Sequence, residues 1–300
     1  MSSPELGELP EAAWASALLA LEAMGPARLR ALLELGQPGE IWMRLRDGGP
    51  ISIPRTSEET VSKWRNAARR LDVHVAWSAM AGLGIVACTR GEHGYPTRLV
   101  DDIEPPEVLF RLGVAVGSEP TVAIVGTRSC TSYGRRAAFE LGAGLAEAGV
   151  RVVSGLALGI DAAAHEGALS VSGASPVGVV GSGLDVVYPR RNRALWHRVV
   201  ERGTLLSESP AGVGPEPWKF PARNRIIAGL ADAVVVVESH PRGGALLTVD
   251  EAQLRGVDVG VVPGPITSPA SAGTNKLLVD GAMPVVCLED VLGLIGHVHP

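Results

Sequence analysis

The sequence is poor in cysteine, with only Cys88, Cys130 and Cys287 among 300 residues. Three widely spaced thiols fit neither a disulfide framework nor a cysteine-based zinc site, and they are typical of a protein in a reducing cytoplasm. No stretch has the length of a membrane span without an interrupting Gly, Pro or charge. The first residues also lack a basic segment followed by an apolar one, so we expect neither a signal peptide nor a membrane anchor.

Several motifs of nucleotide and hydrolase chemistry are missing as well. There is no GxxxxGK[ST], which argues against a P-loop NTPase, and neither Gly126 nor Gly181 begins a GxGxxG. A dinucleotide cofactor is therefore not expected. Ser154 lacks the GxSxG setting of a hydrolase nucleophile, and the sequence places no His near Cys130. We expect no enzymatic nucleophile at either residue.

The formal net charge of −5 excludes a general attraction of the whole chain to nucleic acid. Between Thr121 and Leu230, however, twelve Lys and Arg accompany eight Asp and Glu, a local positive excess. Local asymmetry of this kind is typical of nucleic-acid binding proteins. Much of it comes from arginines that could equally form a solvated helix face, namely Arg190, Arg191, Arg193, Arg198 and Arg202.

The chain is organised around a βαβ unit at Thr121–Asp161. Val122–Val125 is predicted as a buried strand, Arg135–Ala148 as a helix closed by Gly149, and Val150–Val153 as a second strand. Parallel strands joined by a helix cross over right-handedly, so the loops that follow both strands lie on one edge of the sheet. Open α/β sheets bind their ligands at that edge.

Strand and helix patterns continue to alternate after this unit, which predicts an α/β fold. We expect an extended Rossmann-like, doubly wound and mostly parallel sheet over residues 84–300, preceded by a small helical domain over residues 1–83. The further strands are predicted at Gly84–Cys88, Val177–Val180, Thr204–Ser207, Ala233–Val237, Val257–Val262 and Pro284–Val286. The further helices are predicted at Arg193–Arg202, Asn224–Leu230, Leu246–Arg255 and Asn275–Val279, whereas Leu99–Leu112 has a mixed extended and turn character.

The N-terminal domain is predicted to contain helices at Glu11–Met24, Ala27–Leu35 and Ser57–Leu71, the last of them capped by Ser57. The first two helices flank Gly25-Pro26 and resemble half of a helix-hairpin-helix. Such a turn can bind DNA phosphates through its amides, but small bundles use the same spacing merely to pack. We favour the packing role.

Five predicted strands end in polar or Gly-rich loops that meet at the ligand-binding edge, where helix N-termini offer free amides to an anion. Arg128 lies in the first of these loops, and its guanidinium could bind phosphate oxygens as a fork. A surface ion pair is the alternative role. We favour phosphate binding because of the position of the loop.

A second candidate locus is the sequence WKFPARNRIIAG, residues 218–229. Cations beside an exposed aromatic ring suit single-stranded nucleic acid, because the charges follow the backbone while the ring stacks on a base. The alternative is that the ring is buried and the cations are merely solvated. The residues concerned are Lys219, Phe220, Arg223, Asn224 and Arg225.

Asp161 and His165 are four residues apart and would share a helix face, so they could act as acid and base or help to bind a metal. One pair does not complete a metal shell, and an Asp in a first helical turn is stabilised by the helix dipole in any case. We therefore favour a structural role and expect no metal site.

These motifs resemble the DNA-processing protein A (DprA, also Smf) family. The resemblance covers about the last two thirds of the chain, through VAIVGTRSCTSYG, SGLALGIDAAAH, GSGLDVVYPRRNRAL, FPARNRIIAGLADAVVVVES and VPGPITSPASAGTNKLLVDGA. The N-terminal helices are more weakly similar to the sterile-alpha-motif-like module of that family. In the family, a Gly-Ser/Thr-Arg motif and a Phe-Pro-x-Arg-Asn motif form the DNA pocket.

The resemblance implies a non-enzymatic protein that binds single-stranded DNA, dimerises through the Rossmann-like domain and loads the RecA recombinase during natural transformation. The expected DNA-binding residues, from loops and resemblance together, are Gly126, Thr127, Arg128, Ser154, Gly155, Lys219, Phe220, Arg223, Asn224, Arg225 and Lys276. Some members continue into a C-terminal winged-helix-like domain, whereas the present sequence ends at Pro300.

The segment PRGGALLTVDE, residues 241–251, supports a different class. It is reminiscent of the PGGxGTxxE motif of lysine-decarboxylase-like phosphoribohydrolases, which have a related fold. Leu246 and Leu247 occupy the Gly-Thr positions of that motif, and Asp250 occupies the Glu position. Nucleotide hydrolysis is therefore disfavoured, while mononucleotide binding stays an alternative. The same segment also lacks two hydroxyls of the Ser-Gly-Ser-Leu-x-Thr stretch usual in the DprA family.

Overall fold

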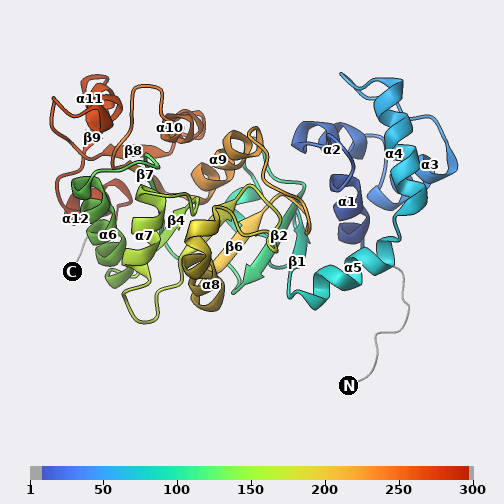
Figure 1. Ribbon diagram of the computed structural model, residues 1–300, viewed down its shortest axis with the longest axis horizontal. Coiled ribbons are helices and arrows are strands. Elements are labelled where there is room, and N and C mark those ends of the chain that lie inside the picture. Colours follow the sequence, from blue (N-terminus) through green and yellow to red (C-terminus); the bar gives the residue numbers. More distant parts are fainter. Residues whose placement is uncertain (1–8, 297–300) are drawn as a thin grey trace.

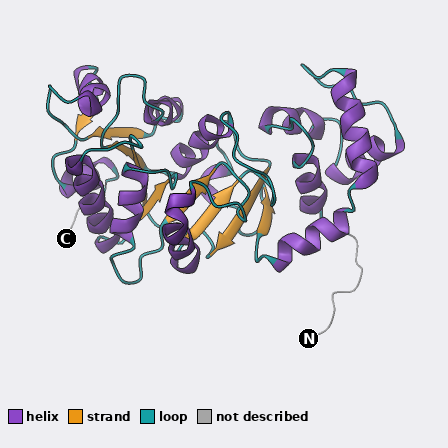
Figure 2. Cartoon of the chain, in the orientation of Figure 1, coloured by secondary structure: helices purple, strands orange, loops and turns teal. Residues whose placement is uncertain are grey.

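A computed structural model describes residues 9–296 and shows a helical unit beside a sheet covered by helices (Figures 1 and 2). The helical unit packs around Leu18, Leu32, Ile41, Leu45 and Trp64, each essentially inaccessible to solvent. Its helices are α1 (Glu11–Leu19), α2 (Pro26–Leu33), α3 (Pro38–Asp47), α4 (Glu58–Arg70) and α5 (Val73–Gly82).

Local capping explains where several of these helices begin and end. The Ser57 hydroxyl accepts a hydrogen bond from the Thr60 amide at 3.3 Å, so the predicted cap of α4 is present. Gly48, at a φ of 83°, adopts the left-handed conformation that ends α3. The first helix is shorter than predicted: it ends at Leu19, and the chain turns before Gly25. Neither α3 nor α5 was predicted.

Within residues 9–296, nine strands form one sheet in the order β1-β2-β6-β5-β4-β3-β7-β8-β9. Strands β3 to β9 run parallel to one another, whereas β2 runs antiparallel to both β1 and β6. The strands are β1 (Val86–Thr89), β2 (Val108–Gly113), β3 (Thr121–Val125), β4 (Arg151–Ser154), β5 (Val177–Val180), β6 (Thr204–Ser207), β7 (Ala233–Val236), β8 (Asp258–Val261) and β9 (Met283–Pro284).

Helices cover both faces of the sheet, as a doubly wound fold requires. Apolar residues of α9 and α10, such as Ile226 and Val249, pack with Val234 and other side chains of one face. Leu141 of α6 and Ala164 of α7 pack on the other. The helices are α6 (Ser132–Glu147), α7 (Ile160–Ala168), α8 (Arg193–Arg202), α9 (Lys219–Leu230), α10 (Ala245–Leu254), α11 (Ala272–Val279) and α12 (Leu288–Leu294). The predicted fold class is confirmed.

The alternating pattern missed β2, because Val108–Gly113 lies in a stretch rich in Pro and acidic residues. The ladder with β6 begins as Phe110 pairs with Ser207, and it places the sheet next to the helical unit. Helix α1 lies against β1 and β2 (Figure 1), and Leu18 and Phe110 belong to one buried cluster. No helix among residues 9–296 is long and apolar enough to cross a membrane.

Candidate nucleic-acid interface

A cleft of about 630 Å³ lies at the carboxyl edge of the sheet, beside the neighbouring strands β3 and β7. The order of the strands reverses at β3: β4, which follows β3 in the chain, lies on one side of β3, and β7 lies on its other side. Such a switch point is the usual ligand site of an open α/β sheet. The cleft is lined by residues from five segments, among them Gly126, Thr127, Arg128, Ala157, Asp161, Tyr188, Phe220, Arg223, Asn224, Gly243, Gly244, Leu247 and Thr248.

Arg128 follows β3 directly and is exposed on the wall of this cleft. Its guanidinium carbon lies 5.2 Å from the centre of the Phe220 ring, which is within the range of a cation–π contact. Among the described residues no acid forms a salt bridge with Arg128. The guanidinium is therefore available to an anion in the cleft.

Phe220 lies in the first turn of α9 and is half-buried, so its ring is not sealed in the core. It forms a tilted pair with Tyr188, whose ring centre is 5.5 Å away at an interplanar angle of 37°. Tyr188 is 39% exposed and was missed by the sequence analysis. The sequence did indicate Tyr188 as a candidate, because this residue lies in the loop that follows the predicted strand at Val177–Val180. The two rings give one wall of the cleft an aromatic surface.

Arg223 lies one helical turn after Phe220 and reaches the floor of the cleft. Its guanidinium is buried and donates a hydrogen bond to the Val179 carbonyl oxygen. Burial lowers the pKa of Arg223 to about 10, the Asp161 carboxylate opposes that shift, and Arg128 adds to it. Arg223 still carries its charge at neutral pH, so the floor of the cleft is cationic.

Gly155 is required by the position of this arginine. A Cβ on Gly155 would lie 2.2 Å from Nη1 of Arg223, so the guanidinium can hold its present position only beside a glycine. Gly155 also donates its amide to Oδ2 of Asp161 at 3.1 Å. It lines a smaller cavity of about 60 Å³ that adjoins the cleft and shares Arg128, Phe220 and Arg223 with it.

Asp161 and His165 share a face of α7, as predicted, and both are buried. Asp161 accepts hydrogen bonds from the amides of Gly155 and Ala157, at 3.1 and 3.4 Å. Burial raises its pKa, and the nearby Arg223 works against that rise. His165 is inaccessible, and burial lowers its pKa to about 4, so it is neutral at pH 7. The carboxylate holds the loop after β4 in place. No cluster of three metal-ligating side chains occurs within residues 9–296.

The loop that carries Arg128 is held by backbone contacts to the end of β7. The Thr127 amide donates to the Glu238 carbonyl oxygen at 2.8 Å. The Glu238 carboxylate accepts hydrogen bonds from the Thr131 amide, at 2.8 Å, and from its hydroxyl. Gly126 has no room for a Cβ, which would lie 2.5 Å from Ile160 and 2.9 Å from the Glu238 carbonyl oxygen. Arg128 therefore projects from a rigid turn.

Comparison with known proteins agrees with this geometry. The model of the family described as DNA recombination-mediator protein A matches residues 86–296. The chain belongs to this family. It is 37% identical to a DNA processing protein DprA of Mycobacterium tuberculosis over 93% of this chain and 70% of the relative. It is 41% identical to DprA of Streptococcus pneumoniae over 66% of this chain and 70% of that one.

Solved structures of the DprA family have the same fold. The crystal structure of DprA from Streptococcus pneumoniae covers 96% of this chain and 98% of its own, with a TM-score of 0.75 and 29% identity. A DprA structure from Helicobacter pylori, described as giving insight into its single-stranded DNA binding mode, covers 72% of this chain and 97% of its own. It has a TM-score of 0.62 and 28% identity.

In this DprA-family chain the structure does not bring every candidate residue to the cleft. Arg225 is buried on the opposite side of α9 from Arg223, because two residues along a helix correspond to a rotation of about 200°. There it pairs with Glu208 at 2.5 Å and lies 3.9 Å from Glu104. The sequence shows two arginines in one basic motif, but only Arg223 lines the cleft.

Three other candidates are also engaged elsewhere. Lys219 bonds to Glu216 at 2.8 Å and to the Gly214 carbonyl oxygen at 3.2 Å. The Ser154 hydroxyl is buried and donates to the Ile124 carbonyl oxygen at 2.5 Å. Lys276, on α11, is exposed and pairs with Asp280. None of the three is among the residues lining the cleft.

The glycine-rich segment before α10 does reach the cleft, where Gly243, Gly244 and Leu247 lie opposite α9. The Gly244 carbonyl oxygen accepts a hydrogen bond from the Asn224 side chain at 3.4 Å. Asp250, at the position of the phosphoribohydrolase glutamate, is exposed on α10 and does not line the cleft. This cleft wall therefore offers backbone groups and a leucine in place of a carboxylate.

Proposed function

We propose that this chain binds single-stranded DNA in the cleft at the carboxyl edge of the sheet. The observation that carries the proposal is the unpaired guanidinium of Arg128 above the half-exposed Phe220 ring, with the cationic Arg223 behind both. A strand could place a phosphate against the two arginines and a base against the ring. Charge-assisted contacts and base stacking are the two terms that dominate binding of unpaired strands.

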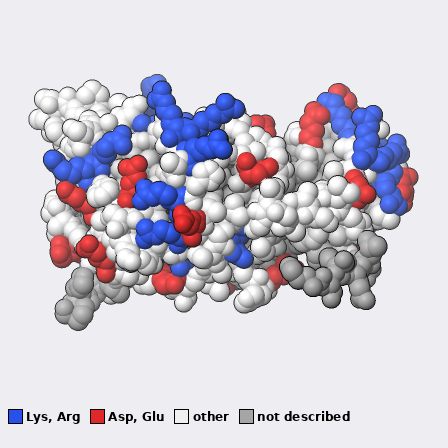
Figure 3. All heavy atoms as spheres, turned by 60° about the horizontal axis from the view of Figure 1, so that its bottom comes forward, with Lys and Arg blue, Asp and Glu red and all other residues white. Residues whose placement is uncertain are grey.

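An aromatic wall favours an unpaired strand over a duplex. In a duplex each base is stacked between its neighbours, so its flat face is not free to contact Phe220 or Tyr188. The cleft volume of about 630 Å³ is that of an ordinary ligand pocket and suits a short stretch of nucleotides. Lys and Arg side chains also gather on the sheet part of one face, with acids scattered among them (Figure 3). This positive excess would attract a phosphate backbone despite the net charge of −5.

We infer a binding protein in preference to an enzyme. Asp161 lines the cleft but is buried and occupied by two backbone amides, and His165, on the same helix face, is inaccessible. The role that fits is protection of incoming strands and loading of the RecA recombinase during natural transformation and recombination, in the cytoplasm. The single-stranded DNA named for the Helicobacter pylori relative supports this proposal.

We also propose that the protein is a homodimer through its Rossmann-like domain. Apolar side chains lie exposed at the end of α11 and around the edge strand β9, where Val279 is 81%, Met283 58% and Val286 77% accessible. Exposed apolar side chains grouped at one edge of the sheet are suited to packing against a second copy of the chain.

A salt titration with fluorescent oligonucleotides tests the proposed function. We expect oligo-dT to bind more tightly than a duplex of equal length, with an affinity that falls linearly on logarithmic axes as salt rises. Equal affinity for both forms would contradict the proposal. Release of free base from nucleoside monophosphates, measured in parallel, would instead support the phosphoribohydrolase alternative.

A further inference from the structure

Helix α9 carries Phe220, Arg223 and Asn224 into the cleft, and it is attached to the N-terminal helical unit at two places. The first is Trp218, the residue before α9. Its ring covers the turn between α1 and α2, where a Cβ on Gly25 would lie 3.6 Å from the ring atoms. Only a small cavity of about 40 Å³ separates this turn from the start of α9.

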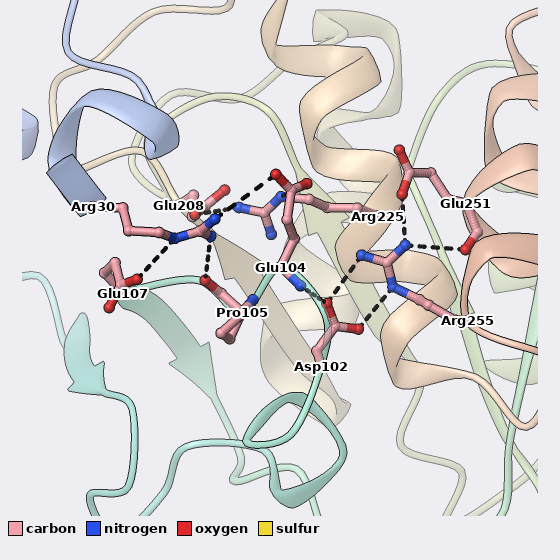
Figure 4. A network of polar contacts seen from close by, with 9 residues as sticks. All are labelled: Arg30, Asp102, Glu104, Pro105, Glu107, Glu208, Arg225, Glu251 and Arg255. Carbon is pink, nitrogen blue, oxygen red and sulfur yellow. Dashed lines mark hydrogen bonds and ion pairs between the residues drawn. The ribbon is translucent and has the colours of Figure 1, made fainter. Parts of the chain in front are cut away.

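The second attachment is a chain of ion pairs (Figure 4). Arg30 of α2 pairs with Glu107 at 3.2 Å and lies 3.9 Å from one carboxylate oxygen of Glu104. The other Glu104 oxygen lies 3.9 Å from Arg225 of α9, whose guanidinium pairs with Glu208 at 2.5 Å. Arg30 also donates to the Pro105 carbonyl oxygen at 3.4 Å. Glu104 thus bridges the helical unit to the back of α9.

The two sides of α9 therefore have different partners. Arg223 faces the cleft, while Arg225 faces the chain of ion pairs. A rotation of the helix, or a slide along its axis, would move Phe220 relative to Arg128, which is held by its own turn after β3. The contact of 5.2 Å between them depends on where α9 lies.

We propose that Arg30 and Trp218 are positioning residues, through which the N-terminal helical unit sets the pose of α9 and thereby the affinity for single-stranded DNA. Neither residue lines the cleft, so the proposal rests on the proposed function but adds a role for the helical unit. The Gly25-Pro26 turn, which resembles a DNA-binding hairpin, then acts by packing against Trp218.

The solvent exposure of the Arg30 ion pairs predicts how a variant at Arg30 behaves. The Arg30 side chain is 34% exposed, and ion pairs with such access to water add little to global stability. Replacing Arg30 should therefore leave the fold intact while releasing one restraint on α9.

The experiment uses the full chain with Arg30→Gln, Trp218→Leu and Arg128→Gln, each titrated with fluorescent oligo-dT over a range of salt concentrations. We expect Arg30→Gln and Trp218→Leu to weaken binding roughly three- to tenfold with an unchanged logarithmic salt slope, because no phosphate contact is lost. Arg128→Gln should reduce the magnitude of the logarithmic salt slope by about 0.7, because one phosphate contact is lost. Arg46→Gln is the matched control: it removes the same charge from the helical unit, but among the described residues Arg46 pairs with its neighbour Asp47 on α3 and not with the acids next to α9. It should bind as the wild type does.

Charge reversal sharpens the test. Arg30→Glu should weaken binding more than Arg30→Gln does, because it also places a second carboxylate beside Glu104. An unchanged affinity of Arg30→Gln would overturn the proposal, and so would a salt slope that falls as it does for Arg128→Gln, since that would mean a direct phosphate contact.

Hydrogen exchange of the free protein separates this proposal from the proposed function. Arg30→Gln should speed amide exchange in residues 219–224 without affecting α10. If exchange in residues 219–224 is faster in Arg30→Gln but the wild type binds no DNA, the DNA function is refuted while the coupling of the two units stands. Unchanged exchange would refute the coupling.

Discussion

The guanidinium of Arg128, after β3, lies 5.2 Å above the ring of Phe220, at the start of α9. The two residues come from distant parts of the sequence and meet in the same cleft. A cation held over an aromatic ring keeps its outward donors free, so one pair of side chains offers both a phosphate contact and a stacking surface.

Arg128→Ala should weaken binding of oligo-dT by about 1–3 kcal/mol, because a charge-assisted hydrogen bond to phosphate is lost. Arg128→Lys should recover only part of this, since an ammonium lacks the planar fork and stacks less well. Fluorescence anisotropy at fixed salt measures both. Wild-type affinity in Arg128→Ala would exclude this residue from the interface.

Gly155→Ala should disturb the floor of the cleft. The added methyl would lie 2.2 Å from Nη1 of Arg223, so either the guanidinium or the loop after β4 has to move. Overpacking of this kind costs about 1–3 kcal/mol in stability, and we expect weaker DNA binding as well. Urea unfolding and anisotropy measure the two effects. Gly293→Ala, on α12 with open space around it, is the control that should lower neither the stability nor the affinity.

His165 should make the protein sensitive to mild acid. Burial lowers its pKa in the folded state to about 4, below its ordinary value near 6.5. The stability that comes from this difference is fully present above pH 6.5 and is lost as the pH falls towards 4. Between pH 7 and 4.5 this linkage amounts to about 2–3 kcal/mol.

Urea unfolding at the two pH values checks this contribution. The variant His165→Gln, which has no group titrating in this range at position 165, should lose less stability than the wild type by that amount. An equal loss in both proteins would show that other groups cause the acid sensitivity.

Met283→Asp should dissociate the proposed homodimer, because a carboxylate would replace an exposed apolar side chain of the edge strand β9. Light scattering after size-exclusion chromatography gives the mass directly. Leu254→Asp makes the same kind of change at an exposed position of α10 and should leave the dimer intact. A monomeric wild type, or a dimeric Met283→Asp, would argue against an interface at this edge.

The sequence by itself determined the alternating α/β fold and the loop of Arg128. Both follow from local rules: an apolar β-branched run makes a strand, and parallel strands bring their carboxyl ends to one edge. Ser57 as the cap of α4 was predictable for the same reason, since its bond to the Thr60 amide spans three residues.

Only the tertiary structure decided which candidate residues meet. Arg223 and Arg225 stand two residues apart in one basic motif, yet the rotation of α9 sends the first to the cleft and the second to Glu208. Tyr188 joins Phe220, and β2 pairs antiparallel with β6, through contacts between segments distant along the chain. The local sequence pattern indicates which face of its own helix or strand a residue occupies. Which partner that residue meets depends on the order of the strands and on how each helix is packed.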